Sequence, residues 1–203
     1  SSPDWYWQRN YIRGTTLYDE VLKQGKHVAA LLWPVTAKSE ITWNLPEIFA
    51  NRRWTNQILT SAANGTVGYQ LMLNHRFGRL RDGIRQPALD NFVHASLKYT
   101  LKTYRPDLTL VHFTDLDTQR HHYGVHSEEA AAAIKRHDER IGELMHLLHQ
   151  NRMSVKRDTT VIILGDHSQL DVRNVILINK LLREQGYLKV QNGRVTEWKA
   201  YCQ

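Results

Sequence analysis

Leu108 to Gly124 read LTLVHFTDLDTQRHHYG, a short apolar run that leads into aspartates and histidines. A second stretch, Thr159 to Leu170, reads TTVIILGDHSQL and repeats this design, because its apolar run stops at Asp166 and His167. Short, bounded runs of Val, Ile, Leu and Thr are typical of parallel strands that are covered on both faces. In an open parallel sheet, ligands bind beyond the carboxyl ends of such strands. We therefore predict two strands whose polar ends converge on one site.

The polar residues at these two strand ends are suited to binding a metal ion. Asp117 and His121 are one helical turn apart, so both side chains can reach the same ion from a turn or a helix. Asp166 and His167 are adjacent, and the loop after the strand can turn both of them inward. Oxygen and imidazole ligands without cysteine suit Zn²⁺, Mn²⁺ or Fe²⁺. The pattern alone leaves a second interpretation open, in which these residues only cap strands and helices.

Other histidines and acids near these stretches have simpler interpretations. The chain has 11 histidines, so some fall beside an acid by chance. His112 lies within the first strand, where we expect a core residue or one that supports a ligand. His122 and His126 are expected to face solvent, and Asp115 to cap the turn.

The composition is that of an ordinary globular protein, with 41% hydrophobic and 23% charged residues in a chain of 203. This length suits one domain, which we place over residues 1–203, and no apolar run approaches the ~18 residues that a membrane span needs. The single cysteine, Cys202, excludes a disulfide framework and a thiolate metal site, and fits a reducing compartment. Because no signal peptide is visible, these features favour a cytoplasmic location.

The formal net charge of +7 suggests an acidic partner, either nucleic acid or a small phosphorylated molecule. The Lys and Arg residues are scattered, with only a loose cluster in His75 to Arg85. This scatter favours a solvated basic surface over a nucleic-acid interface. The charge by itself does not decide the function.

Helices and strands alternate in the rest of the pattern, which predicts an α/β fold with a mostly parallel sheet flanked by helices. The amino-terminal half begins with a helix and a strand, and the carboxyl-terminal end contains a hairpin around Asn192-Gly193. The elements expected between and beside the two strands are a helix at 16–24 closed by Gly25, a strand at 27–33, helices in 56–86, a helix opened by Asp90, a long helix capped by Ser127, and a helix at 174–184.

The segments TDLDTQRHHYG and ILGDHSQLD resemble two signature segments of the type I phosphodiesterase/nucleotide pyrophosphatase family, within the alkaline phosphatase superfamily. Asp117, His121 and Gly124 match the first segment, and Asp166 and His167 match the second. Trp33-Pro34 is similar to the Trp-Pro that opens the family's substrate-side loop. The resemblance implies an alkaline-phosphatase-like layered fold. It also implies an enzyme that hydrolyses phosphodiester or nucleotide pyrophosphate bonds in a small phosphorylated substrate, such as a nucleotide.

The resemblance also implies two divalent metal ions, usually Zn²⁺ with Mn²⁺ as an alternative. Asp117 and His121 would bind one ion together with a later histidine, and Asp166 and His167 would bind the other with an earlier aspartate and a Thr or Ser nucleophile. We expect that nucleophile before Ser1 and the later histidine after Gln203. Residues 1–203 would then be the middle of a larger catalytic domain, incomplete at both ends and inactive alone.

Two positions depart from the family pattern, since Arg120 and Ser168 stand where glycine is common. Trp33, Trp43 and Asn44 are the residues we expect to contact a base or an acyl group of the substrate. Two other functions stay open. One is another hydrolase of the superfamily that acts on phosphomonoesters, sulfates or phosphonates, and the other is a non-catalytic basic module that binds phosphate or nucleic acid.

Overall fold

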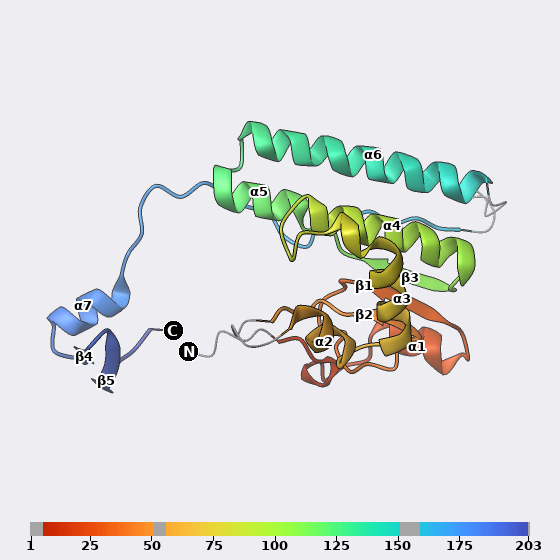
Figure 1. Ribbon diagram of the computed structural model, residues 1–203. Helices are drawn as coiled ribbons and strands as arrows, with labels where there is room; N and C mark the ends of the chain where they lie inside the picture. The colour runs from red at the N-terminus through yellow and green to blue at the C-terminus, as the bar shows by residue number, and fades with distance from the viewer. Residues whose placement is uncertain (1–5, 51–55, 151–158, 203) are drawn as a thin grey trace. The chain divides into compact units, whose positions relative to one another are not determined.

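A computed structural model describes residues 6–50, 56–150 and 159–202 of the chain (Figure 1). The residues form two compact units, one within Asp4–Gln169 and the other within Leu170–Gln203, and each is described by itself. The prediction of a single partial domain over 1–203 stays a prediction. None of the helices in the described ranges is long and apolar enough to cross a membrane.

A three-stranded parallel sheet forms the centre of the larger unit. The strands are β1 (Val28–Leu31), β2 (Trp43–Leu45) and β3 (Leu108–Val111), in the order β2-β1-β3. In their registers, Ala30 of β1 pairs with Asn44 on one side and with Leu110 on the other. Because all three strands run the same way, the residues that follow them meet at one edge of the sheet.

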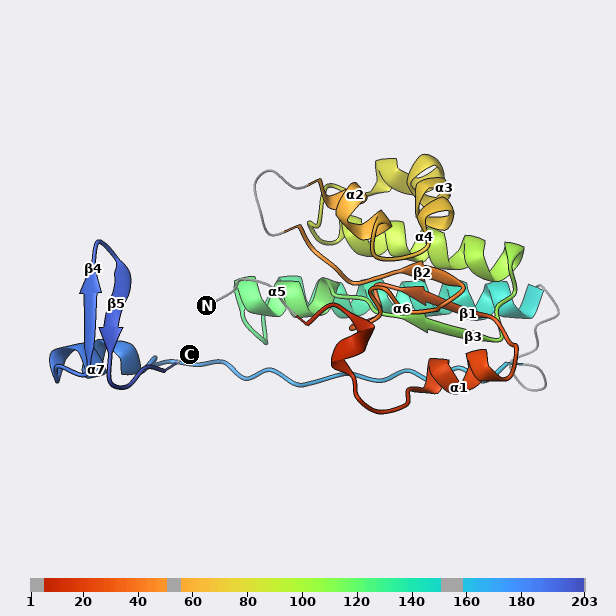
Figure 2. The ribbon, with the colours of Figure 1, turned by 90° about the horizontal axis from the view of Figure 1, so that it is seen from below.

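Alternate side chains of β1 enter two different apolar clusters, as the two-residue period of a strand requires. Ala29 and Leu31 pack with Leu73, Phe92 and other side chains from the helices on one face. Val28 and Ala30 pack with Tyr18 on the other face. Helix α1 therefore covers one face and helices α3 and α4 cover the opposite one (Figure 2). The helices of this unit are α1 (Leu17–Lys23), α2 (Gln57–Ala62), α3 (Val67–Phe77), α4 (Ala88–Thr103), α5 (Asp115–Tyr123) and α6 (Glu128–Gln150), with 3-10 turns η1 (Arg9–Tyr11) and η2 (Gly78–Leu80).

The helix ends follow the residues that favour them. Thr16 and Asp19 form a reciprocal capping box at the start of α1, and Gly25 follows its end with a φ of +71°. Ser127 Oγ accepts a hydrogen bond of 3.1 Å from the Ala130 amide at the start of α6. The predictions of these two helices are confirmed.

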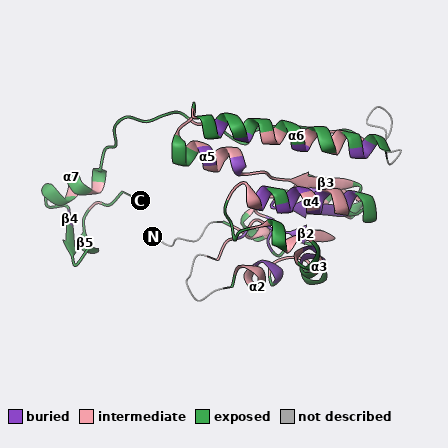
Figure 3. Cartoon of the chain, turned by 45° about the horizontal axis from the view of Figure 1, so that its top comes forward, coloured by how far each residue is buried: buried purple, intermediate pink, exposed green. Residues whose placement is uncertain are grey.

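The smaller unit contains α7 (Ile178–Glu184) and the antiparallel pair β4 (Leu188–Gln191) and β5 (Arg194–Trp198). Asn192 and Gly193 both have positive φ, at +51° and +74°, which is the geometry of the two-residue hairpin that the Asn-Gly pair predicts. Helix α7 starts later than the predicted residue 174. Most residues of this unit are exposed (Figure 3).

The predicted strand at residues 159–165 is wrong, since the structure has no regular element there. A strand needs a neighbouring backbone as hydrogen-bond partner, and in the described part of the chain no ladder joins this run to β3. Val161 packs against the larger apolar cluster, whereas Ile162, Ile163 and Leu164 are exposed. The α/β class, with a parallel sheet flanked by helices, is confirmed.

Candidate functional site

Two polar side chains follow the carboxyl ends of β2 and β3. Glu47 comes directly after Pro46, and His112 directly follows β3, where its amide donates a 3.1 Å hydrogen bond to the Leu31 carbonyl. The His112 Nδ1 atom lies 3.6 Å from Glu47 Oε1, and both side chains are mostly buried. An acid and an imidazole are thus held together at this edge of the sheet.

The pKa of His112 reflects two opposing influences. Burial alone lowers the pKa of this imidazole because it disfavours the charged form. The negative charge of the neighbouring Glu47 carboxylate, with smaller contributions from Asp166 and Asp90, outweighs burial and raises the pKa of His112 above its usual value. The carboxyl edge therefore holds a histidine that is protonated more readily than an ordinary one.

Helix α5 carries the first predicted ligand pair beyond the end of β3. Asp117 and His121 are four residues apart on α5, and Asp117 Oδ1 lies 3.4 Å from His121 Nε2. The helical period predicted this proximity, because residues i and i+4 lie on the same face.

The second predicted pair approaches the first, although it lies about 50 residues further along the chain. His167 Nε2 is 3.9 Å from Asp117 Oδ1 and 3.6 Å from Asp166 Oδ2. The charge of Asp166 also acts on His112. The structure thus brings Asp117, His121, Asp166 and His167 into one group, called the Asp/His cluster below.

The geometry of the Asp/His cluster fits a divalent metal ion in part. Asp117 Oδ1 is buried without a hydrogen-bond partner among the described residues, although two imidazole nitrogens face it. Two ligands on one tetrahedral Zn²⁺ lie roughly 3.3 Å apart, given Zn–N and Zn–O bonds of about 2.0–2.1 Å. The 3.4 Å between Asp117 and His121 matches that separation. Among the described residues, however, no three His, Cys, Asp or Glu side chains are arranged to hold one ion.

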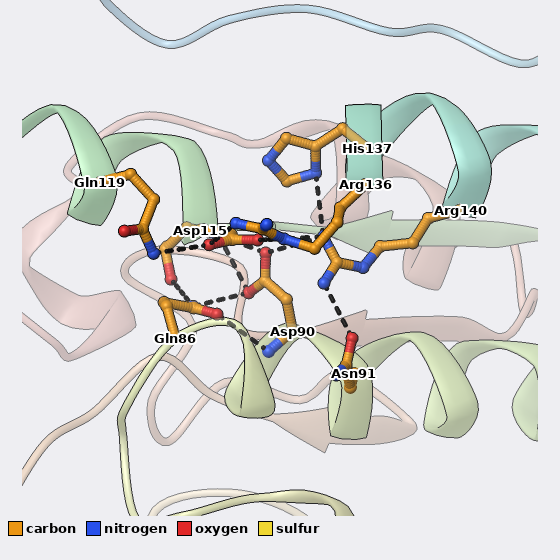
Figure 4. A network of polar contacts seen from close by, with 9 residues as sticks. Gln86, Asp90, Asn91, Asp115, Gln119, Arg136, His137 and Arg140 are labelled. Carbon is orange, nitrogen blue, oxygen red and sulfur yellow. Dashed lines mark hydrogen bonds and ion pairs between the residues drawn. The ribbon is translucent and has the colours of Figure 1, made fainter. Parts of the chain in front are cut away.

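A network of buried charges lies at the start of α5 (Figure 4). Asp115 accepts hydrogen bonds from Arg136 Nε at 2.6 Å and Arg136 Nη2 at 3.0 Å. Arg140 Nη1 lies 3.5 Å from Asp115 Oδ2 and 3.8 Å from Asp90 Oδ2. Asp90 and Asp115 are both fully buried. We call these four residues, from α4, α5 and α6, the buried network.

The two aspartates of the buried network have opposite pKa shifts. For Asp115, burial raises the pKa, but the hydrogen bonds and charge of Arg136 outweigh it, so the pKa lies below its usual value. For Asp90, burial dominates over its hydrogen bonds and raises the pKa. The prediction that Asp115 caps a turn therefore understates its role, because it pairs with two arginines of α6.

The three predicted substrate contacts lie in different places. Trp33 follows β1 at the carboxyl edge and packs against the cluster around Tyr18. Trp43 begins β2 at the amino edge, where its ring stacks on Tyr104 with centroids 4.8 Å apart. Asn44 is buried, and its Nδ2 donates to the Thr36 carbonyl at 2.6 Å. The structure does not bring Trp43 and Asn44 to the Asp/His cluster, and the substrate contacts of all three stay predictions.

Sequence reasoning missed Glu47 and the roles of Asp90, Arg136 and Arg140. Glu47 follows a strand of only three residues, which is too short to stand out in the sequence as an apolar run. The two arginines lie on the long helix α6, where a solvated face is the usual expectation for charge. No local signal in the sequence links them to Asp90.

Comparison with protein families places these segments in context. The model of one family, described as type I phosphodiesterase / nucleotide pyrophosphatase, matches residues 1–202. No curated protein and no solved structure matches the chain. The family match spans both segments that supply the Asp/His cluster and nearly the whole chain.

Proposed function

The chain belongs to the type I phosphodiesterase/nucleotide pyrophosphatase family, and from this premise we propose that it hydrolyses phosphodiester or nucleotide pyrophosphate bonds with the help of divalent metal ions. The family consists of hydrolases of this type and is generally metal-dependent. The observation that carries the proposal is the approach of His121 and His167 to one unbonded oxygen of Asp117.

The proposal gives each member of the Asp/His cluster a role. Asp117 and His121 would hold one ion, and Asp166 and His167 would hold the second, with Zn²⁺ or Mn²⁺ suited to their oxygen and imidazole donors. Ions bound there would polarise the phosphoryl oxygen and stabilise charge on the leaving oxygen. Metal binding at this place would require the carboxylates in their deprotonated form and the imidazoles in their neutral form. We assign the attacking hydroxyl to no residue of this chain.

The pair of Glu47 and His112 supports an anionic substrate at the same edge. Glu47 raises the pKa of His112, so this imidazole gains positive charge more readily than an ordinary histidine beside the Asp/His cluster. A formal net charge of +7 acts in the same direction over a longer range. We propose a small phosphorylated substrate, such as a nucleotide, with Trp33 as a candidate aromatic contact.

The test is hydrolysis by the protein at its full natural length, measured with a chromogenic phosphodiester and the matching monoester. Zn²⁺ or Mn²⁺ is supplied, and a chelator is added in a parallel reaction. We expect cleavage of the diester in preference to the monoester, and loss of that activity with the chelator and with Asp166→Ala.

The matched control is Asp138→Ala, an exposed carboxylate on α6 that is not part of the Asp/His cluster. It should leave cleavage unchanged. Preference for the monoester would redirect the proposal to another hydrolase of the superfamily. Cleavage that survives both the chelator and Asp166→Ala would refute the metal-dependent proposal.

A further inference from the structure

The start of helix α5 is not capped by the side chain of its own N-cap residue. Thr114 stands at the N-cap position, and in the described structure its side chain accepts no hydrogen bond from the first turn. The first amides of a helix need acceptors, particularly where they are buried. Here the acceptor comes from a different helix.

Asp90 of α4 supplies that acceptor with both carboxylate oxygens. The Thr114 amide donates to Asp90 Oδ1 at 3.1 Å, and the Asp115 amide donates to Asp90 Oδ2 at 3.0 Å. Because one fully buried carboxylate accepts both hydrogen bonds, it fixes the direction of the helix axis and the rotation of α5 about it.

Gln86 holds Asp90 in this position from the turn before α4. Its Nε2 donates to Asp90 Oδ1 at 2.8 Å and to Thr114 Oγ1 at 2.7 Å, and its Oε1 accepts from the Asp90 amide at 3.2 Å. Gln86 therefore contacts both Asp90, which accepts the hydrogen bonds at the start of α5, and Thr114, which donates one of them. Figure 4 shows Gln86, Asp90 and Asp115 side by side at this point.

The rotation of α5 determines where the Asp/His cluster forms. Asp117 lies two residues after Asp115 and His121 lies one turn further, so an error in the helix start moves both side chains. On the opposite side, Arg136 and Arg140 of α6 hold the Asp115 carboxylate. Helix α5 is thus fixed from α4 through its backbone and from α6 through a side chain.

Burial of these charges is expensive for stability, since the desolvation of ions can exceed their attraction. The raised pKa of Asp90 agrees with that penalty. Replacing a buried ion pair with well-packed apolar side chains is often neutral or stabilising, so stability alone does not account for this arrangement. Precise placement of a neighbouring site is one such explanation.

We propose that Asp90 is a positioning residue, whose buried carboxylate sets the start of α5 and thereby places Asp117 and His121 opposite His167. The proposal rests on the proposed function only in that the placed residues are taken to bind metal. It assigns Asp90 no contact with metal or substrate.

The experiment compares the full chain with Asp90→Asn and Asp90→Ala by amide hydrogen exchange and by titration with Mn²⁺. Asn keeps one carbonyl acceptor and is expected to retain part of the effect, which Ala removes. We expect amide exchange in α5 to accelerate roughly tenfold or more relative to the amides of α6. Affinity for Mn²⁺ should fall by about 10–100-fold, the range found when partners of metal ligands are removed.

The control is Asp82→Ala, an exposed carboxylate that forms an ion pair with Arg85 in the same turn. It should change neither readout. A folded Asp90→Ala protein with unchanged α5 exchange and unchanged affinity would overturn the proposal. So would uniformly faster exchange across all helices, because that result marks a role in stability alone. If the unsubstituted chain binds no Mn²⁺, the proposed metal site fails, and the exchange comparison still decides the role of Asp90.

Discussion

Asp115 and Asp117 are two aspartates of one short helix that lie two residues apart and have opposite surroundings. The side chain of Asp115 is 0% exposed, whereas that of Asp117 is 43% exposed. Both oxygens of Asp115 accept hydrogen bonds, from Arg136 and Gln119. Asp117 Oδ1 has no hydrogen-bond partner in the described part of the chain and faces two histidines.

This difference separates a carboxylate that holds the fold from one that is available to a ligand. Arginine is always charged and binds a carboxylate in two places at once, so the buried network is closed. Histidine changes its charge near neutral pH and can release its nitrogen to a metal, so the Asp/His cluster is open. The same residue type is therefore enclosed by arginines at one position of α5 and left without a hydrogen bond two residues later.

The largest effect is expected from Asp115→Ala in the buried network. Removing one partner leaves Arg140 buried beside a gap, which typically costs about 3–5 kcal/mol in the free energy of unfolding. Urea denaturation measures this change. Asp117→Ala is the matched control and should stay within about 0.5 kcal/mol. Equal losses for the two variants would remove the distinction drawn between them.

A smaller effect is expected from Asp117→Ala, and it should appear in metal affinity instead of in the free energy of unfolding. Loss of a direct ligand should weaken Mn²⁺ or Zn²⁺ binding by on the order of 100-fold or more, about 2.7 kcal/mol, because even the partners of ligands contribute 10–100-fold. Calorimetric titration gives the affinity. Asp138→Ala, an exposed acid on α6, serves as the control. Unchanged affinity for the Asp117 variant would place the ion elsewhere.

Local patterns in the sequence predicted local geometry correctly. The spacing of Asp117 and His121 predicted their proximity on α5, and the Asn192-Gly193 pair predicted the hairpin of the smaller unit. Such features depend on a few neighbouring residues, whose geometry is set by helical period or turn type. The metal-binding role of the Asp/His cluster stays a prediction.

Several features that depend on distant residues were not predictable, although the approach of His167 to Asp117 was predicted. The apolar run at 159–165 has the composition of a strand, yet strand formation requires a backbone partner that composition does not specify. Similarly, Asp90 was interpreted as the start of an amphipathic helix, and its role as acceptor for the amides of α5 arises only in the packed structure. Nothing in the local sequence around Arg136 or Arg140 distinguishes them from surface arginines.

The pH dependence of stability can also separate the two aspartates of the buried network. The lowered pKa of Asp115 means that its stabilisation is complete above the unfolded value near 4 and is lost as the pH falls through the folded value. Asp115→Asn should therefore flatten the acid side of the stability curve, by at most one proton or about 1.4 kcal/mol per pH unit. Asp90 has a raised pKa, so Asp90→Asn should steepen the rise of stability above pH 4. Urea denaturation at several pH values tests both slopes, and equal slopes in the two variants would contradict the assignment.

The smallest effect is expected from His121→Gln, which removes the histidine that pairs with Asp117. His121 pairs with Asp117 across one exposed helical turn, and such pairs contribute about 0.2–0.5 kcal/mol to the free energy of unfolding. Arg136→Gln is the counterpart in the buried network and should cost several times more, because it leaves the fully buried Asp115 carboxylate short of donors. Thermal unfolding of the two variants gives this ratio directly. A loss of stability for His121→Gln as large as that for Arg136→Gln would mean that the exposed histidine also stabilises the fold. That result would contradict the interpretation of the Asp/His cluster as available to a ligand.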